Sequence, residues 1–259
     1  MQLLPLPAFD DNYIWTLRDD SGNALVVDPG EARPVLAAAA DGFEPTAILL
    51  THHHADHIGG VAELLARWPR LPVFAPHDER IATATVRISD GDQLRIGNWS
   101  LETIAVPGHT TSHVAFFCQT AGNHGLLFSG DTLFSLGCGR MFEGSAAQML
   151  ASLDRLAALP GDTRVCCGHE YTLSNAAFAR AVDPDNPALR RRTEEVHAMR
   201  ADGLPSLPST LSVECDSNPF LRVDAASVRT AVASHAGRSL DDRVDVFAEL
   251  RRWKDGFRG

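Results

Sequence analysis

Four histidines and one aspartate lie within six consecutive residues, in the segment Thr51-His52-His53-His54-Ala55-Asp56-His57-Ile58-Gly59-Gly60. Neutral imidazole and carboxylate groups are ligands of zinc and similar transition metals. The apolar residues 47–50 predict a buried strand before this segment, and the two glycines predict a turn into a helix at 61–68. The cluster is therefore expected in a loop at the carboxyl end of a strand, where α/β folds place their chemistry. The segment predicts a metal site rather than a chance run of surface histidines.

Three later apolar segments also end in a loop that carries a potential metal ligand. The predicted strand 99–106 is followed by His109, the predicted strand 125–129 by Asp131, and the predicted strand 163–167 by His169. Together with the first segment they supply seven candidate ligands: His52, His54, Asp56, His57, His109, Asp131 and His169. Seven protein ligands are too many for one tetrahedral zinc ion and suit two ions.

Asp131 is the candidate for a ligand shared by both ions. If it bridges them, one ion is completed by His52, His54 and His109, and the other by Asp56, His57 and His169. A metal pair about 3.5–4 Å apart can hold a bridging hydroxide and polarise a carbonyl. We therefore expect hydrolysis by a metal-bridging hydroxide held by Asp131, without a protein nucleophile. Zinc is the expected metal, with iron and manganese as alternatives.

Neighbouring residues are expected to support the ligands. In an extended loop His53 should point away from the histidines on either side of it, so it is assigned a structural or supporting role. His113 is expected to be a structural residue of a strand, with orientation of a ligand as the alternative. Asp28, at the end of the predicted strand 24–27, is a candidate hydrogen-bond acceptor for a ligand imidazole.

Composition narrows the class of protein. The 259 residues suffice for one large domain or two modest ones, and a hydrophobic fraction of 44% is ordinary for a soluble globular chain. No apolar run is long enough for a membrane span, and the N-terminus lacks the basic region of a secretory signal, so a cytoplasmic protein without a membrane partner is expected. The net charge of −10 argues against nucleic acid as a partner. The five cysteines are expected to be buried free thiols.

The chain changes character near residue 170. Up to that point predicted strands and helices alternate, whereas the later part predicts four helices, at 175–182, 187–200, 225–234 and 241–254. We therefore predict an α/β catalytic domain at 1–169 that binds the metals and a smaller helical domain at 170–259. The first segment has a net charge of −9 and the second of −1. An anionic ligand would find its counter-charge in the second segment.

The segment 51–60 has the His-x-His-x-Asp-His signature of the metallo-β-lactamase superfamily, and the whole chain more closely resembles the hydroxyacylglutathione hydrolase family. The motifs that carry this resemblance are Asp11-Asn12-Tyr13, Pro107-Gly108-His109-Thr110, Phe128-Ser129-Gly130-Asp131-Thr132-Leu133-Phe134, Gly137-Cys138-Gly139-Arg140-Met141-Phe142-Glu143-Gly144, Cys167-Gly168-His169-Glu170-Tyr171-Thr172 and Asn218-Pro219-Phe220-Leu221-Arg222. They span nearly the whole chain.

The resemblance implies an αββα metallo-β-lactamase sandwich with a helical C-terminal domain that supplies part of a glutathione site. It implies hydrolysis of S-(2-hydroxyacyl)glutathione, notably S-D-lactoylglutathione, to glutathione and D-lactate in the detoxification of methylglyoxal. The positions that match glutathione contacts in the family are Arg140, Phe142, Tyr171, Arg251 and Lys254. A monomer whose partner is this small-molecule thioester is expected.

The sequence departs from the family pattern in two places. Phe142 stands where animal members have tyrosine, so a hydroxyl contact is lost there, and Trp253 interrupts the common Arg-Arg-Glu-Lys-Asp sequence near the C-terminus. Glutathione presents carboxylates, which cations should face. Lys254, the only lysine in the chain, suits that part.

Three alternatives belong to different functional classes. A persulfide dioxygenase of the same fold uses one iron ion, but it would leave the second ligand set and the long helical region unexplained. A non-catalytic binding module would be expected to have lost ligands, and none is missing. A metallo-β-lactamase proper would be expected to carry an export signal and to lack the helical domain.

Overall fold

The computed structural model describes residues 1–119 and 124–258. The chain forms two compact units and passes between them more than once along its length. The first unit contains Met1–Ala105, Ser112–Gly130 and Cys166–His169, and the second contains Val106–Thr111, Asp131–Val165 and Glu170–Gly259. Each unit has its own arrangement of strands and helices.

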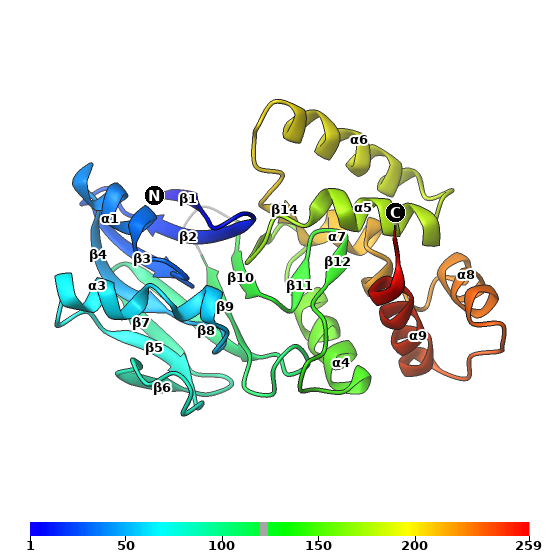
Figure 1. The fold of residues 1–259 in the computed structure, drawn as a ribbon, viewed down its shortest axis with the longest axis horizontal. Helices are drawn as coiled ribbons and strands as arrows, with labels where there is room; N and C mark the ends of the chain where they lie inside the picture. Colours follow the sequence, from blue (N-terminus) through cyan, green and yellow to red (C-terminus); the bar gives the residue numbers. More distant parts are fainter. Residues whose placement is uncertain (120–123, 259) are drawn as a thin grey trace. The chain divides into compact units, whose positions relative to one another are not determined.

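The first unit contains a six-stranded mixed sheet with strands in the order of the chain (Figure 1). The strands are β1 (Gln2–Ala8), β2 (Asn12–Arg18), β3 (Asn23–Val27), β4 (Glu44–Leu49), β5 (Val73–Pro76) and β6 (Val86–Ile88). The β1–β2 and β2–β3 pairs are antiparallel, whereas β3 to β6 are parallel. Because parallel strands end at the same edge of a sheet, the loops after β3, β4 and β5 begin there together.

Helices α1 (Arg33–Ala40) and α3 (Val61–Arg67) cover one face of this sheet (Figure 1). Val35 of α1 and Leu64 of α3 share a core with Val26 and Ile48 of the strands. Pro34 lies in the first turn of α1, where its fixed φ and missing N–H cost nothing, and the helix begins there. The short helix α2 (Ala55–Ile58), which the sequence did not predict, follows the histidine loop.

The second sheet lies largely in the first unit, where its strands follow the order β7-β8-β9-β10-β13. They are β7 (Gln93–Ile96), β8 (Trp99–Ala105), β9 (Val114–Gln119), β10 (Leu126–Gly130) and the end of β13 (Arg164–Cys167). Pairing is antiparallel from β7 to β10. Residues 86–96 contribute two strands to different sheets, because β6 pairs with β5 and β7 pairs with β8.

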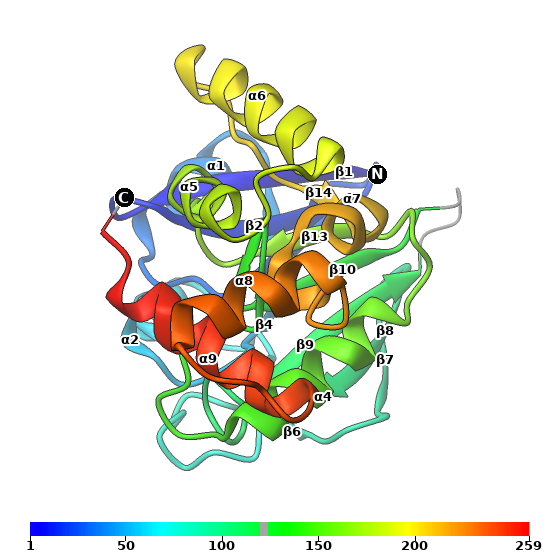
Figure 2. The same ribbon diagram turned by 90° about the vertical axis from the view of Figure 1, so that its right-hand side faces the viewer.

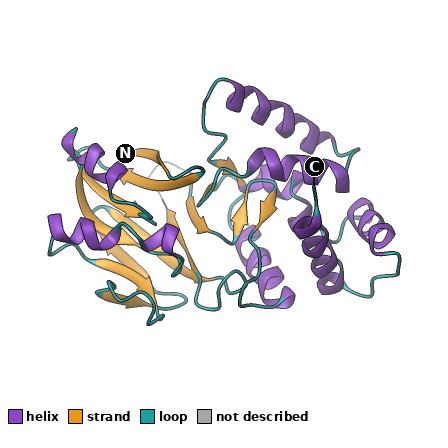
Figure 3. Cartoon of the chain, in the orientation of Figure 1, coloured by secondary structure: helices purple, strands orange, loops and turns teal. Residues whose placement is uncertain are grey.

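Helices make up most of the second unit (Figures 2 and 3). They are α4 (Ala146–Ala157), α5 (Thr172–Val182), α6 (Pro187–Ala201), α7 (Leu211–Ser217), the 3₁₀ turn η1 (Pro219–Leu221), α8 (Ala226–Ala236) and α9 (Arg243–Gly256). Two small strand pairs accompany them. Strands β11 (Leu133–Phe134) and β12 (Gly137–Cys138) form a hairpin, and β14 (Ser209–Thr210) pairs with the start of β13.

Polar caps fix where the helices of the second unit begin. The Ser145 hydroxyl accepts from the Gln148 amide and the Gln148 side chain accepts from the Ser145 amide, which is a complete capping box for α4. Asn186 and Asp242 cap α6 and α9 in the same way, each accepting from a backbone amide of the first turn. Buried Phe178, Phe220 and Phe247 pack inside this unit.

Two further expectations concern the cysteines and membrane-spanning segments. The five cysteines are free thiols and four of them are buried, as the sequence predicted, whereas Cys215 is half-buried, contrary to the prediction. In the part of the chain that the structure describes, no helix is both long and apolar enough to cross a membrane.

Candidate metal centre

The loop after β4 carries the first ligands because the backbone around it is closely packed. Asp28, which follows β3, has a φ of +51°, a left-handed conformation that aspartate tolerates better than most residues. The next turn needs a glycine: a Cβ on Gly30 would lie 1.8 Å from the carbonyl oxygen of Asp56. The loops after β3 and β4 therefore touch through their main chains, and Asp28 is brought beside the histidine loop.

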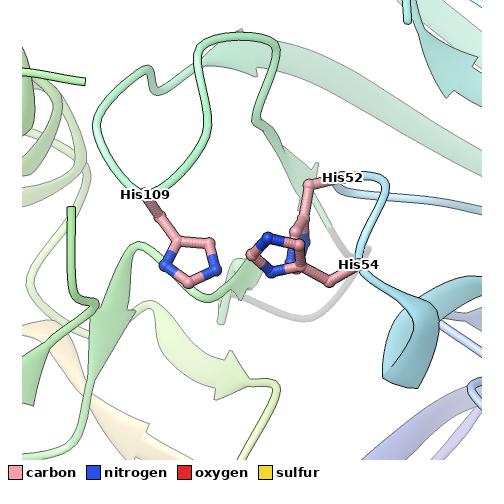
Figure 4. Close-up of side chains that lie close together, drawn as sticks. All are labelled: His52, His54 and His109. Carbon is pink, nitrogen blue, oxygen red and sulfur yellow. The ribbon is translucent and has the colours of Figure 1, made fainter. Parts of the chain in front are cut away.

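His52 and His54 lie on this loop with their ring centroids 4.7 Å apart (Figure 4). The hydroxyl of Thr51 donates its one proton to Asp28 Oδ2, at 2.7 Å. The same hydroxyl oxygen lies 3.0 Å from His52 Nδ1, so Nδ1 must be the donor in that contact. Nε2 of His52 consequently carries the lone pair that a metal requires.

His57 is oriented by the same aspartate. Its Nδ1 donates to Asp28 Oδ2 at 3.0 Å, while Asp28 Oδ1 accepts from the Thr51 amide at 2.8 Å. Both oxygens of Asp28 are thus used in holding the histidine loop, although the possible ligand atoms of Asp28, His52 and His57 also lie within 4.8 Å of one another. The expected hydrogen bond from an imidazole of the histidine loop to Asp28 is present in the structure.

Asp56, His57 and His169 form a three-residue group whose candidate ligand atoms lie within 4.8 Å of one another. Asp56 Oδ2 lies 3.5 Å from His57 Nε2 and 3.3 Å from His169 Nε2. His169 Nδ1 donates to Asp11 Oδ1 at 2.8 Å, and Asn12 Nδ2 donates to Asp56 Oδ2 at 3.0 Å. The turn between β1 and β2 therefore orients two members of this group.

The second unit contains the other two candidate ligands, His109 and Asp131. His109 follows β8 (its ring is drawn in Figure 4) and donates from Nδ1 to the carbonyl of Arg140 at 2.8 Å. Its Nε2 lies 3.5 Å from Asp131 Oδ2. Gly139 is required here, because a Cβ would lie 1.9 Å from the carbonyl oxygen of Asp131 and 3.3 Å from His109 Nδ1.

The imidazoles share a pattern that fits a divalent metal. In His52, His57, His109 and His169 the Nδ1 atom donates to a hydroxyl, a carboxylate or a carbonyl, which leaves Nε2 as the ligand atom. Metal-binding histidines in proteins are held by their second nitrogen in this way. The chain therefore carries clusters of histidine and aspartate suited to divalent metal binding.

The two other histidines near the ligands have partners of their own. His53 Nδ1 lies 3.4 Å from Asp78 Oδ2. The His53 ring does not point away from both neighbours, as an extended loop predicts, because it meets the ring of His54 edge-on with centroids 4.8 Å apart. His113 stacks on His52, with ring centroids 4.6 Å apart and planes at 17°. His113 thus contacts a candidate ligand, which was the alternative interpretation of its role.

Most of the predicted glutathione contacts lie around one carboxylate of the second unit, that of Asp255. Arg140 is largely exposed, and its Nε is 3.5 Å from Asp255 Oδ1. Arg251 is buried; it donates from Nη2 to the same oxygen at 3.0 Å and from Nη1 to the carbonyl of Cys138 at 2.8 Å. The guanidinium of Arg251 also lies over the ring of Phe220.

Lys254, Phe142 and Tyr171 complete the predicted set. Lys254 Nζ donates to the carbonyl of Ser174 at 3.1 Å, and burial, followed by the charges of Arg251 and Arg140, lowers the pKa of Lys254 to about 8. Phe142 is 64% exposed and meets the His109 ring edge-on. Tyr171 contacts Phe134. The exposed ring of Phe142, the exposed Arg140 and the half-buried Lys254 are suited to an anionic ligand with an apolar part.

Sequence reasoning predicted Asp28 as a partner of an imidazole but missed the other partners. Thr51, Asp11 and Asn12 stand at strand ends, and their residue types do not indicate which side chain each of them contacts. The acceptor for His109 is a main-chain carbonyl, and because every residue has one, the sequence does not indicate which carbonyl will be the acceptor.

Comparison with known proteins supports the metal-binding fold. Residues 9–169 match the family model of the metallo-β-lactamase superfamily. Two solved structures are similar: the B3 metallo-β-lactamase BLEG-1, with 25% identity, a TM-score of 0.63 and coverage of 85% of this chain and 98% of that one, and TTHA1623 in a di-iron-bound form, with 27% identity, a TM-score of 0.58 and coverage of 85% and 100%. The expected metallo-β-lactamase fold is thereby confirmed.

The C-terminal part of the chain and its full-length relatives identify the family within this superfamily. Residues 170–257 match the model described as hydroxyacylglutathione hydrolase C-terminus, which confirms a helical C-terminal region of that kind. The hydroxyacylglutathione hydrolase of Xylella fastidiosa (strain M23) is 61% identical over 257 residues, which cover 99% of this chain and 98% of the relative. The chain belongs to the hydroxyacylglutathione hydrolase family of the metallo-β-lactamase superfamily.

Proposed function

We propose that the chain hydrolyses the thioester bond of S-(2-hydroxyacyl)glutathione, notably S-D-lactoylglutathione, to give glutathione and D-lactate in methylglyoxal detoxification. Full-length similarity to relatives named hydroxyacylglutathione hydrolase supports this substrate class. The observation that carries the proposal is the shared orientation of four imidazoles, each with Nδ1 donating and Nε2 left as a metal ligand.

The proposed centre holds two divalent ions. His52, His54 and His109 would bind one, Asp56, His57 and His169 the other, and Asp131 both. The Asp56–His57–His169 group of the first unit supports one half of this set. The 3.5 Å approach of His109 to Asp131 in the second unit supports the shared carboxylate. Zinc is the proposed metal; imidazole and carboxylate also accept iron and manganese, and the similar protein TTHA1623 has been solved in a di-iron-bound form.

When bound, two such ions polarise a carbonyl and lower the pKa of a coordinated water, so thioester hydrolysis needs no protein nucleophile. The protein's own contribution is orientation. Asp28 holds the Nδ1 proton of His57, and through Thr51 it fixes the tautomer of His52. Asp11 holds the Nδ1 proton of His169. Each acceptor raises the basicity of its imidazole and prevents the ring from turning.

Glutathione would be bound by Arg140, Phe142, Tyr171, Arg251 and Lys254. Arg140 and Lys254 offer positive charge to its carboxylates, and the aromatic residues offer apolar contact. Arg251 is buried and donates to the Asp255 carboxylate, and Arg140 lies beside the same carboxylate. These contacts support a role for Arg251 in holding Asp255 in place.

We also propose a functional division at residue 169, with catalysis in 1–169 and much of the glutathione site in 170–259. The two family models, which meet at that residue, support this division. The protein would act as a cytoplasmic monomer whose partner is a small thioester, without nucleic acid or membrane. The net charge of −10 supports the exclusion of nucleic acid.

The test is turnover of S-D-lactoylglutathione before and after chelation, with metal analysis of the same sample. We expect hydrolysis with two metal ions per chain, loss of activity on chelation and recovery with zinc. One iron per chain, with oxygen consumed on glutathione persulfide, would instead identify a dioxygenase. A metal-loaded chain that turns over neither substrate would identify a binding module.

A further inference from the structure

Asp78 is a buried carboxylate outside the proposed ligand set. It lies in the loop that follows β5, and only 9% of the residue is exposed. Its Oδ1 accepts from the backbone amide and Nε of Arg80, at 3.0 and 2.8 Å, and its Oδ2 accepts from Arg80 Nη2 at 2.8 Å. Hydrogen bonds from the Arg80 side chain hold the pKa of Asp78 well below its usual range, so the carboxylate is charged.

The loop that carries Asp78 is rigidly attached to the sheet. Arg87 of β6 donates from Nη1 to the carbonyls of Pro76 and Asp78 and from Nη2 to the carbonyl of Ile81. Strands β4 and β5 are parallel neighbours, so the histidine loop and the Asp78 loop leave the sheet side by side. Asp78 is thus a fixed point beside the proposed ligands.

Two contacts run from Asp78 Oδ2 toward the ligands. His53 Nδ1 lies 3.4 Å away, which is long for a hydrogen bond. The Ser112 hydroxyl donates to the same oxygen at 2.6 Å. The residue after Ser112 is His113, whose ring stacks on His52.

Both contacts bear on the same segment of chain. His53 stands between two proposed ligands, so a displacement of its side chain moves the backbone of His52 and His54 together. The second contact acts through Ser112 and His113. The amide of Val114, the residue after His113, donates to the carbonyl of Thr51 at 2.9 Å, which keeps the His113 ring against His52. Asp78 therefore holds the histidine loop through its middle residue and through the ring stacked upon it.

We propose that Asp78, neutralised by Arg80, is a positioning residue that holds His52 and His54 in the geometry required for metal binding. This inference rests on the proposed ligand set. The competing explanation is that the Asp78–Arg80 pair serves the stability of the fold alone. The two differ in what the loss of Asp78 changes: a purely structural pair would change stability alone, whereas a partner of metal ligands also changes metal affinity.

The experiment compares zinc affinity in Asp78→Asn, Ser112→Ala and wild-type protein by competition with a chromophoric chelator. We expect one of the two zinc ions to bind about 10–100-fold more weakly in Asp78→Asn, and Ser112→Ala to weaken the same ion by a smaller factor. KM for the glutathione thioester should be unchanged, because Asp78 contacts none of the proposed substrate residues. In NMR spectra of the metal-free proteins, the imidazole nitrogen signals of His52 and His54 should be broader in Asp78→Asn than in wild type.

The matched control is Asp245→Asn, which also removes a carboxylate bonded twice by one arginine, Arg238, but in the second unit. It should leave the affinity for both zinc ions unchanged. Equal zinc affinities in wild type, Asp78→Asn and Ser112→Ala would overturn the inference, even if the variants unfold at lower temperature. Should Asp78→Asn fail to fold, the milder Ser112→Ala variant and the NMR measurement still decide.

A further variant separates this inference from the proposed function. His52→Ala should lose one zinc ion outright if His52 is a ligand. Retention of both ions by His52→Ala would refute the ligand set itself. Loss of an ion in His52→Ala, with unchanged zinc affinity in Asp78→Asn, would refute only the positioning role.

Discussion

Asp131 is the residue with the largest expected effect on the metal centre. As the proposed shared ligand, it would contact both ions, so Asp131→Ala should lose both, whereas a variant of any other ligand should lose one. Metal analysis of the purified variant checks this. The matched comparison is His109→Ala, since His109 approaches Asp131 within the same unit. Two ions retained by Asp131→Ala would contradict the bridging role.

If Lys254 contacts glutathione as proposed, it should give the reaction a pH dependence that arises from binding rather than from the chemical step. Burial lowers its pKa to about 8. The ammonium is therefore charged below pH 8 and neutral above it, whereas an ordinary lysine stays charged to about pH 10.4. We expect KM for lactoylglutathione to rise as the pH passes through 8. In Lys254→Arg, which stays charged, this inflection should disappear; its persistence would remove Lys254 from the glutathione site.

At the scale of residues, the sequence predicted which side chains could be ligands but not how they are oriented. Histidine and aspartate can be recognised as possible metal ligands from residue type and spacing. The Nδ1 acceptors other than Asp28 cannot be predicted in this way, because Asp11 is far from His169 in the chain and the partner of His109 is a carbonyl. Orientation arises from tertiary contacts, and these are invisible in a single sequence.

At the scale of elements, the β11–β12 hairpin depends on a buried carboxylate of α7. Glu214 accepts from the Ser135 hydroxyl at 2.8 Å and from the amide of Leu136, a residue with φ of +58°, at 2.7 Å. Glu214→Ala would leave these buried donors unsatisfied, at a cost of about 3 kcal/mol in the free energy of unfolding. Urea denaturation measures it. Glu195→Ala, which removes an exposed partner of Arg192, should cost less than about 1 kcal/mol.

The elements that the sequence missed are the short ones. Periodicity predicted α6, α8 and α9 to within a few residues, because each has a cap or a long pattern. The two-residue strands β11, β12 and β14 exist only through pairing with distant segments, so no local pattern announces them. The same is true of α2, a single turn of helix.

At the scale of the whole molecule, the helical part does not form a compact unit by itself. Its unit includes Asp131–Val165, and α9 is tied to α4 by two 2.8 Å bonds between Arg243 and Asp154. Asn218 also donates to the carbonyls of Phe134 and Gly137. A fragment of residues 170–259 should therefore unfold without cooperativity in a circular dichroism melt. A sharp transition would show instead that 170–259 folds alone.

The burial of the cysteines has a consequence for an enzyme whose product is a thiol. Disulfide exchange with glutathione requires an accessible thiolate, and burial raises the pKa of Cys118 and of Cys138 to about 11. Cys138 stays protonated although it lies two residues from Arg140. We expect a thiol reagent to modify only Cys215 in the native chain and all five cysteines in the chain unfolded by urea. More than one reactive native thiol would contradict this. The enzyme could then release glutathione into either a reduced or an oxidised pool without becoming glutathionylated near its own substrate site.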